Sequence, residues 1–89
     1  MSVSCKALVK NKRGIHARPS SEIAKTALTF NSEIIIKSRG KKANAKDVLQ
    51  IIMLELFEGS KVAIEANGTD EKKALNKIKK LLEKEYKFD

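Results

Sequence analysis

Hydrophobic and polar residues alternate in two stretches of the chain, and this period of two is the pattern of a strand with one buried face. The hydrophobic positions of the first stretch are Val3, Cys5, Ala7 and Val9. Those of the second stretch are Val62, Ile64 and Ala66. The alternation therefore predicts one strand near the start of the chain and another over residues 62–66.

Two shorter strands are expected between these stretches. Residues 33–38 include three consecutive isoleucines, a β-branched run that is typical of strands. Residues 41–46 alternate again, with Ala43 and Ala45 on the inner face. The Arg-Gly dipeptide that ends at Gly40 is a turn signal. We therefore expect the two strands to pair as a hairpin.

Hydrophobic residues at helical spacing predict two helices in the first two thirds of the chain. The first helix is expected over about residues 18–28, because the fixed φ of Pro19 suits a first helical turn. Asp47 is a good N-cap for the second helix, and Gln50 three residues later completes a capping-box pattern. We expect the second helix to end at Gly59.

A third helix is predicted after the Asn67-Gly68 turn, with Thr69 or Asp70 as its cap. Its buried stripe is expected to consist of Leu75, Ile78, Leu81 and Leu82. The order β-α-β-β-α-β-α predicts an α+β fold, with four short strands in one antiparallel or mixed sheet and helices on one face. The other face of such a sheet can remain in contact with water. We expect residues 1–89 to form a single domain.

The distribution of charge indicates an anionic partner. The chain has 89 residues, with 19 Lys and Arg against 11 Asp and Glu, and a net charge of +8. Residues 1–46 contain 11 basic residues and only two acidic ones, Glu22 and Glu33, which gives this half +9. Such a field attracts phosphate groups, nucleic acid or an acidic protein surface.

The single cysteine and the single histidine restrict the possible chemistry. Cys5 cannot form a disulfide within the chain, which fits a reducing cytoplasm. Cys5 and His16 are too few for a zinc site, although carboxylates leave hard-metal sites open, and we expect no metal and no cofactor. No apolar run approaches the ~20 residues of a membrane span, and the first ten residues lack the pattern of a secretory signal. We therefore expect a cytoplasmic monomer without membrane insertion.

The most informative segment joins the first strand to the first helix and reads GIHARPS over residues 14–20. His16 lies near the expected helix N-terminus, and Arg18 follows two residues later. Backbone N–H groups at a helix start bind anions, above all phosphate. Neutral imidazole can accept a phosphoryl group, and a guanidinium is a forked donor suited to phosphate oxygens. A lone histidine at such a position is more often a cap or an exposed residue, but its neighbours favour phosphoryl chemistry at His16 with help from Arg18.

Residues 14–19, Gly-Ile-His-Ala-Arg-Pro, resemble the active-site signature of the HPr family, the histidine-containing phosphocarriers of the bacterial phosphoenolpyruvate-dependent sugar phosphotransferase system. The chain length, the order of elements, the Asn67-Gly68 turn and the Asn44-Ala45-Lys46 segment also fit this family. The resemblance therefore covers essentially the whole chain. It implies an open-faced β-sandwich, a four-stranded antiparallel sheet with three helices packed on one face.

The resemblance also implies a relay rather than a free-standing enzyme. Enzyme I, charged by phosphoenolpyruvate, would phosphorylate His16 on Nδ1, with Arg18 stabilising the charge. The A domain of a sugar-specific permease would then receive the phosphoryl group during sugar uptake. Two positions depart from the family pattern. Asp47 replaces a serine that a kinase phosphorylates in many relatives, and it is either a simple N-cap or a permanent partial mimic of the phosphorylated form; Ser20-Ser21 replace the usual alanine-type residues.

The expected second helix is apolar nearly all round, so one side should be exposed in so small a protein. In the HPr family this helix docks donor and acceptor. We predict contacts with these partners at Val48, Leu49 and Met53, against the alternative that these residues lie in the core.

Two other functions fit parts of the pattern. An RNA-binding module has a similar order of elements, but the first and third expected strands lack the aromatic residues on which bases stack, so we expect no nucleic-acid partner. A regulatory relative that kept the histidine but signals instead of serving sugar uptake is the second alternative. Histidine phosphatases are disfavoured, because they need further catalytic histidines and this chain has one.

Overall fold

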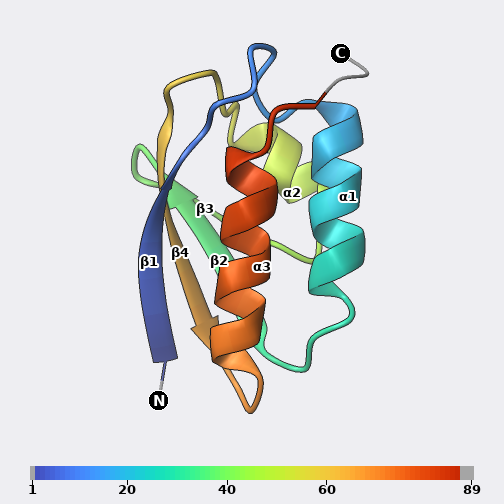
Figure 1. Ribbon diagram of the computed structural model, residues 1–89, viewed down its shortest axis with the longest axis vertical. Helices are drawn as coiled ribbons and strands as arrows, with labels where there is room; N and C mark the ends of the chain where they lie inside the picture. Colours follow the sequence, from blue (N-terminus) through green and yellow to red (C-terminus); the bar gives the residue numbers. More distant parts are fainter. Residues whose placement is uncertain (1, 87–89) are drawn as a thin grey trace.

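The computed structural model describes residues 2–86, whose elements follow the predicted order (Figure 1). The strands are β1 (Ser2–Leu8), β2 (Glu33–Ser38), β3 (Lys41–Asn44) and β4 (Lys61–Asn67). The helices are α1 (Ala17–Ala27), α2 (Val48–Met53) and α3 (Glu71–Glu83). No helix among these residues is long and apolar enough to cross a membrane.

The strands form one sheet in the order β1-β4-β2-β3, and every neighbouring pair is antiparallel. Figure 1 shows the helices gathered on one side of this sheet, to its right in the view, with α1 and α3 side by side. The predicted α+β fold, an open-faced β-sandwich with three helices on one face, is confirmed. The expected hairpin is also confirmed, because Ser38 pairs with Lys41 and Ile36 with Ala43 across β2 and β3.

The core lies between the sheet and the helices. The inward residues that alternation predicted within residues 62–66 are buried, and so are Ile34 and Ile36 of β2. They pack in one hydrophobic cluster with Ile23 from α1 and Ile78 from α3. The strand period therefore predicted the buried face of β4 correctly, and the helix period that of α3. In β1, Val3 and Cys5 are only half-buried.

The predicted end of the second helix, at Gly59, is wrong. Helix α2 ends at Met53, and Glu55 adopts a left-handed φ of 54°, which takes the chain out of the helix. Leu54 and Leu56 are nevertheless buried. The apolar run continued past the helix because the segment after it also enters the core, so composition alone concealed the boundary. The last two residues of the predicted strand 41–46 likewise form a turn, since β3 ends at Asn44.

The two predicted acidic caps behave differently. Asp47 Oδ1 accepts hydrogen bonds from the N–H groups of Leu49 and Gln50 at 3.0 and 3.3 Å, which confirms it as an N-cap. Asp70 precedes α3 but does not cap it through its side chain. Its carboxylate accepts instead from the backbone N–H groups of Asn31 and Ser32 and from the Ser32 hydroxyl. Asp70 therefore ties the α1–β2 loop to the start of α3.

Asp70→Asn should reduce stability in a pH-dependent way. Hydrogen bonds from Ser32, first its hydroxyl, and from Asn31 lower the pKa of the Asp70 carboxyl. The carboxylate thus stabilises the fold above the ordinary aspartate pKa of about 3.9, and this contribution is lost as the pH falls through the lower folded-state value. Urea unfolding should show a lower free energy of unfolding for the variant at neutral pH and a smaller difference from wild type in acid. The exposed control Glu58→Gln should stay within about 0.5 kcal/mol of wild type at neutral pH, and a variant as stable as wild type at neutral pH would contradict the role of Asp70.

Candidate functional site

His16 is the N-cap residue of α1, at the helix start that the sequence predicted. Its backbone is extended, with φ −86° and ψ −160°, and its carbonyl accepts the first helical hydrogen bond from Ser20 N–H at 3.0 Å. Its side chain does not cap the helix and is half-buried. Arg18 is exposed in the first turn. The first N–H groups of a helix have no acceptor within it, so the positive end of α1 lies at the segment that carries His16 and Arg18.

A close backbone contact fixes the loop that leads to His16. Gly14 has a left-handed φ of 69°, and a Cβ atom there would lie 2.1 Å from the carbonyl oxygen of Leu56. The N–H of Ile15 donates to that same oxygen at 3.0 Å. Only glycine permits this approach, because any larger residue would collide with the backbone after α2. The loop of His16 is therefore docked on the segment that follows α2.

Further hydrogen bonds hold the same loop from both sides. Val9 N–H donates to the Ser60 carbonyl at 3.0 Å, and Gly59 N–H donates to the Val9 carbonyl at 2.7 Å. The buried Asn11 side chain donates to the Gly14 carbonyl at 2.9 Å and accepts from Tyr86 N–H at 2.8 Å. This loop thus has a fixed conformation rather than being merely a connection, which suits a preorganised site.

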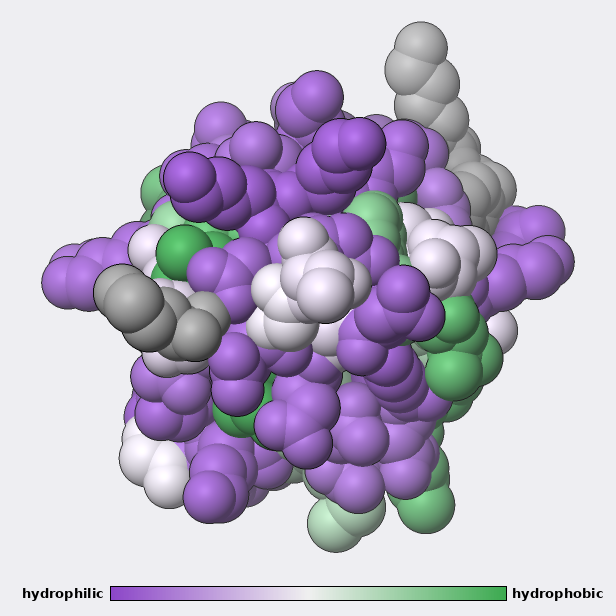
Figure 2. Space-filling view, turned by 90° about the horizontal axis from the view of Figure 1, so that it is seen from below, coloured by the Kyte–Doolittle hydropathy of each residue, from purple (hydrophilic) through white to green (hydrophobic). Residues whose placement is uncertain are grey.

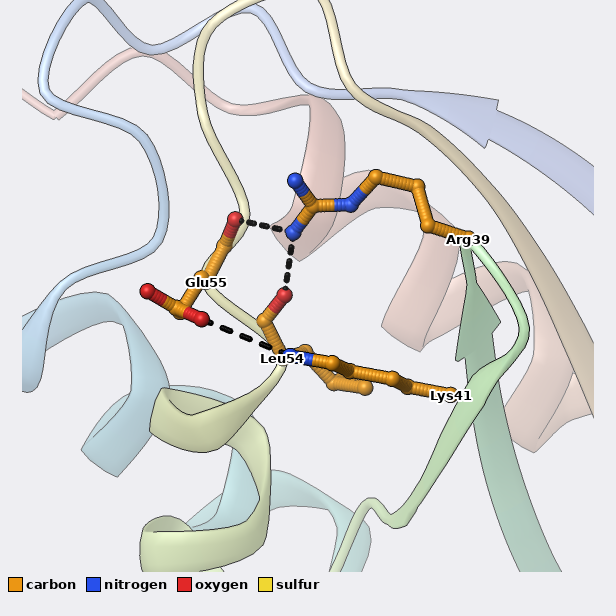
Figure 3. A network of polar contacts seen from close by, with 4 residues as sticks. All are labelled: Arg39, Lys41, Leu54 and Glu55. Carbon is orange, nitrogen blue, oxygen red and sulfur yellow. Dashed lines mark hydrogen bonds and ion pairs between the residues drawn. The ribbon is translucent and has the colours of Figure 1, made fainter.

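Arg39 fixes the segment on which the loop docks. Its guanidinium reaches from the β2–β3 turn to donate to the carbonyls of Leu54 and Glu55 at 2.6 and 2.7 Å (Figure 3). The ammonium of Lys41 pairs with the Glu55 carboxylate at 3.4 Å. The guanidinium also lies 5.2 Å from the centre of the Phe57 ring. The sequence indicated Arg39 only as part of a turn, because nothing local links it to residues fifteen or more positions later.

The structure separates the three residues predicted to contact partners. Leu49 and Met53 are 65% and 63% exposed, whereas Val48 is half-buried and packs against the core. Ile52 and Phe57 are also exposed, and the sequence analysis did not single them out. We call Leu49, Ile52, Met53 and Phe57 the α2 patch. Exposed hydrophobic residues concentrated in one short segment, as here within residues 49–57, are typical of an interaction site.

The Cys5 thiol and the possible metal ligands among residues 2–86 are less suited to a functional site than the His16 segment. Burial raises the pKa of the Cys5 thiol, with Lys79 opposing and Glu83 reinforcing the effect, which favours the unreactive thiol. No group of three or more His, Cys, Asp or Glu residues that could hold a metal ion lies among residues 2–86. The end of the molecule opposite the His16 loop is covered mainly by hydrophilic residues, with hydrophobic ones in small separate groups (Figure 2).

The fold and the site together define a class of small α+β proteins. It is an open-faced β-sandwich in which a histidine begins the first helix and the loop that carries it is docked on the segment after α2. Residues 3–84 match the family model described as the PTS HPr component phosphorylation site. The chain is 42% identical to the phosphocarrier protein HPr of Mycoplasma pneumoniae over 78 residues, 86% of this chain and 89% of the relative. It is 38% identical to HPr of Borreliella burgdorferi over 81 residues, 91% and 94% of the two chains.

The fold agrees with the same assignment. The crystal structure of a phosphocarrier protein HPr from Bacillus anthracis superposes with a TM-score of 0.88 and 30% identity, covering 92% of this chain and 98% of the other. The chain belongs to the HPr family of phosphocarrier proteins of the bacterial phosphotransferase system.

Proposed function

We propose that this protein accepts a phosphoryl group on His16 from phospho-enzyme I and passes it to the A domains of sugar-specific permeases during sugar uptake. Membership of the HPr family supports phosphoryl transport within the phosphotransferase system. The observation that carries the proposal for this residue is the place of His16 as N-cap of α1, beside Arg18 and the positive helix end.

Phosphoryl transfer at His16 exchanges one bond to phosphorus for another. The lone pair of His16 Nδ1 attacks phosphorus, a nitrogen–phosphorus bond forms, and the bond from phosphorus to the donor group breaks. The phosphorylated ring carries roughly two negative charges when ionised, which the N–H groups at the start of α1 and the Arg18 guanidinium stabilise. Attack by the acceptor on the same phosphorus reverses these changes and restores the imidazole. The protein is thus a carrier whose catalytic turnover belongs to its partners.

The α2 patch, with Val48 at its border, is the proposed docking surface for donor and acceptor. Helix α1 contacts α2, and the His16 loop docks on the segment after α2. This patch and His16 therefore lie on neighbouring segments. Its hydrophobic side chains suit a protein interface, while the basic first half of the chain favours acidic partners. Asp47 is the N-cap of α2, the helix that carries this patch, and its carboxylate cannot be phosphorylated by a serine kinase.

Leu49→Ala is expected to slow transfer to and from the partners without changing the chemistry at His16. Truncating an interface leucine should lower the second-order rate constant about tenfold, because docking contacts are lost. The matched control is Leu28→Ala, since Leu28 is also 65% exposed but lies at the other end of α1. Stopped-flow transfer from phospho-enzyme I compares the two variants. Equal rates for both would contradict docking through the α2 patch.

The direct test of the function is incubation with enzyme I and phosphoenolpyruvate followed by mass spectrometry. We expect a gain of one acid-labile phosphoryl group, which an added permease A domain then removes. A protein that stays unlabelled under these conditions would contradict the proposal. Sequence-selective RNA binding that persists at high salt would instead favour the nucleic-acid module.

A further inference from the structure

Three lysines lie in one row across the open face of the sheet. The strand register pairs Lys6 of β1 with Ala63 of β4, Ala63 with Lys37 of β2, and Lys37 with Lys42 of β3. All three lysines are exposed. Like charges directly opposite each other across two strands destabilise a sheet. An anionic partner on this face would relieve that repulsion.

The row of lysines crosses a groove with a volume of about 970 Å³. The small side chain of Ala63 lies between the longer stems of Lys6 and Lys37, so the middle of the row is hollow. Leu8 supplies a further apolar surface and is 41% exposed. The other basic residues that line the groove are Arg39, Lys41 and Lys61. One acidic residue, Glu83, also lines the groove, and its carboxylate accepts a hydrogen bond from the Leu8 N–H at 3.0 Å. Apolar surface bordered mainly by cations favours a ligand that is both acidic and aliphatic.

Intramolecular ion pairs neutralise only part of this charge. Lys37 pairs with Glu65 at 3.0 Å, and Lys41 pairs with Glu55, after α2, at 3.4 Å. Within residues 2–86, no ion pair engages Lys6, Lys42 or Lys61. Three cations around the groove are therefore available to a partner.

The spacing of these cations distinguishes between kinds of anion. Lys6 and Lys42 are three strands apart, which corresponds to about 14 Å at roughly 4.8 Å per strand. Carboxylates on alternate residues of an extended peptide repeat at about 6.6–6.8 Å, so three of them cover that distance. No aromatic residue is among those that line the groove in the described part of the chain, which disfavours stacked nucleobases.

We propose that this groove binds an acidic segment of a protein partner. The carboxylates of the segment pair with Lys6, Lys42 and Lys61, and its aliphatic side chains lie on Ala63 and Leu8. The groove is lined by residues of the strands, of the β2–β3 turn and by Glu83 of α3, but neither by His16 nor by any residue of the α2 patch, so this partner can bind while the α2 patch is occupied. The site is thus independent of phosphoryl transfer at His16.

The test uses the full chain and a short fluorescein-labelled peptide of alternating glutamate and leucine. The triple variant Lys6→Gln/Lys42→Gln/Lys61→Gln should bind the peptide about tenfold more weakly in fluorescence anisotropy, as expected when several exposed ion pairs are lost together. The matched control changes the exposed lysines of α3 and removes the same charge, with the substitutions Lys72→Gln, Lys73→Gln and Lys77→Gln. The control should bind as wild type does. Equal affinities of the two triple variants would overturn the proposal.

Three further measurements test the inferred repulsion between lysines, the independence of the groove from His16 and the chemical class of the ligand. Because the groove variant loses only exposed charges and some mutual repulsion, its melting temperature should equal or exceed that of wild type; a lower value would contradict the inferred repulsion. His16→Ala should leave peptide binding unchanged, and weakened binding there would overturn the independence of the groove. Inorganic tripolyphosphate or an RNA oligonucleotide that binds the groove more tightly than the peptide at equal salt would contradict an acidic protein segment as its ligand.

Discussion

His16→Ala is expected to abolish phosphoryl acceptance while the protein remains folded. The substitution removes the nucleophilic nitrogen, but the link of this residue to α1 is its backbone carbonyl, which the alanine variant retains. The side chain is only half-buried, so the free energy of unfolding should change by less than about 1 kcal/mol. Mass spectrometry after incubation with enzyme I and phosphoenolpyruvate should show labelled wild type and unlabelled variant, and urea unfolding checks the fold.

The matched control for this experiment is Ser21→Ala. Ser21 is an exposed hydroxyl residue in the first part of α1, and it is an alternative phosphoryl acceptor a few positions from His16. Its variant should be labelled as wild type is, and the label should be lost in acid, as a phosphohistidine is and a phosphoserine is not. Labelling of His16→Ala to the same extent as wild type would reject the assignment.

Gly14→Ala should have the second largest effect, because it damages both the fold and the site. A left-handed φ costs a non-glycine residue about 1–3 kcal/mol, and the new Cβ would lie 2.1 Å from the Leu56 carbonyl oxygen. The hydrogen bond from Ile15 to that oxygen would then be displaced at a cost of about 1 kcal/mol. We expect the free energy of unfolding to fall by about 2–4 kcal/mol, and the initial rate of phosphorylation to fall with it, since His16 is carried by the same loop.

Gly40→Ala separates backbone strain from the close contact. Gly40 also has a left-handed φ, of 78°, but a Cβ atom there would meet nothing within 4 Å. We expect a loss of about 1 kcal/mol and an unchanged phosphorylation rate. Urea unfolding and initial rates at a temperature where both variants are folded give the comparison. If the two variants lost stability and activity equally, the docking of the His16 loop on the segment after α2 would have no special role.

The helix boundaries show where sequence reasoning succeeded and where it failed. The start of α1 was predicted within one residue, because Pro19 is a local signal. The N-cap role of Asp47 was likewise predicted from a spacing of three residues. The end of α2 was predicted wrongly, at Gly59, because buried leucines beyond Met53 resemble a continuing helix unless their tertiary partners are known.

The candidate site shows the same division. The histidine, its place at a helix start and the neighbouring guanidinium were all evident within a few residues of sequence. The contact between Gly14 and Leu56 was not, since the two residues are 42 positions apart in the sequence. The support from Arg39 and the exposure of Ile52 and Phe57 also lay beyond local patterns.

The sequence by itself determined the order of strands and helices, the extent of α1, the buried faces of β4 and α3 and the residue that we expect to carry phosphate. Periodicity, caps and motifs predict these features because they act over a few neighbouring positions. Only the tertiary structure decided the length of α2, the docking of the His16 loop and the alignment of Lys6, Lys37 and Lys42 on one face. Each of these depends on strand register and on packing between segments far apart in the chain, and such contacts leave no short-range pattern in the sequence.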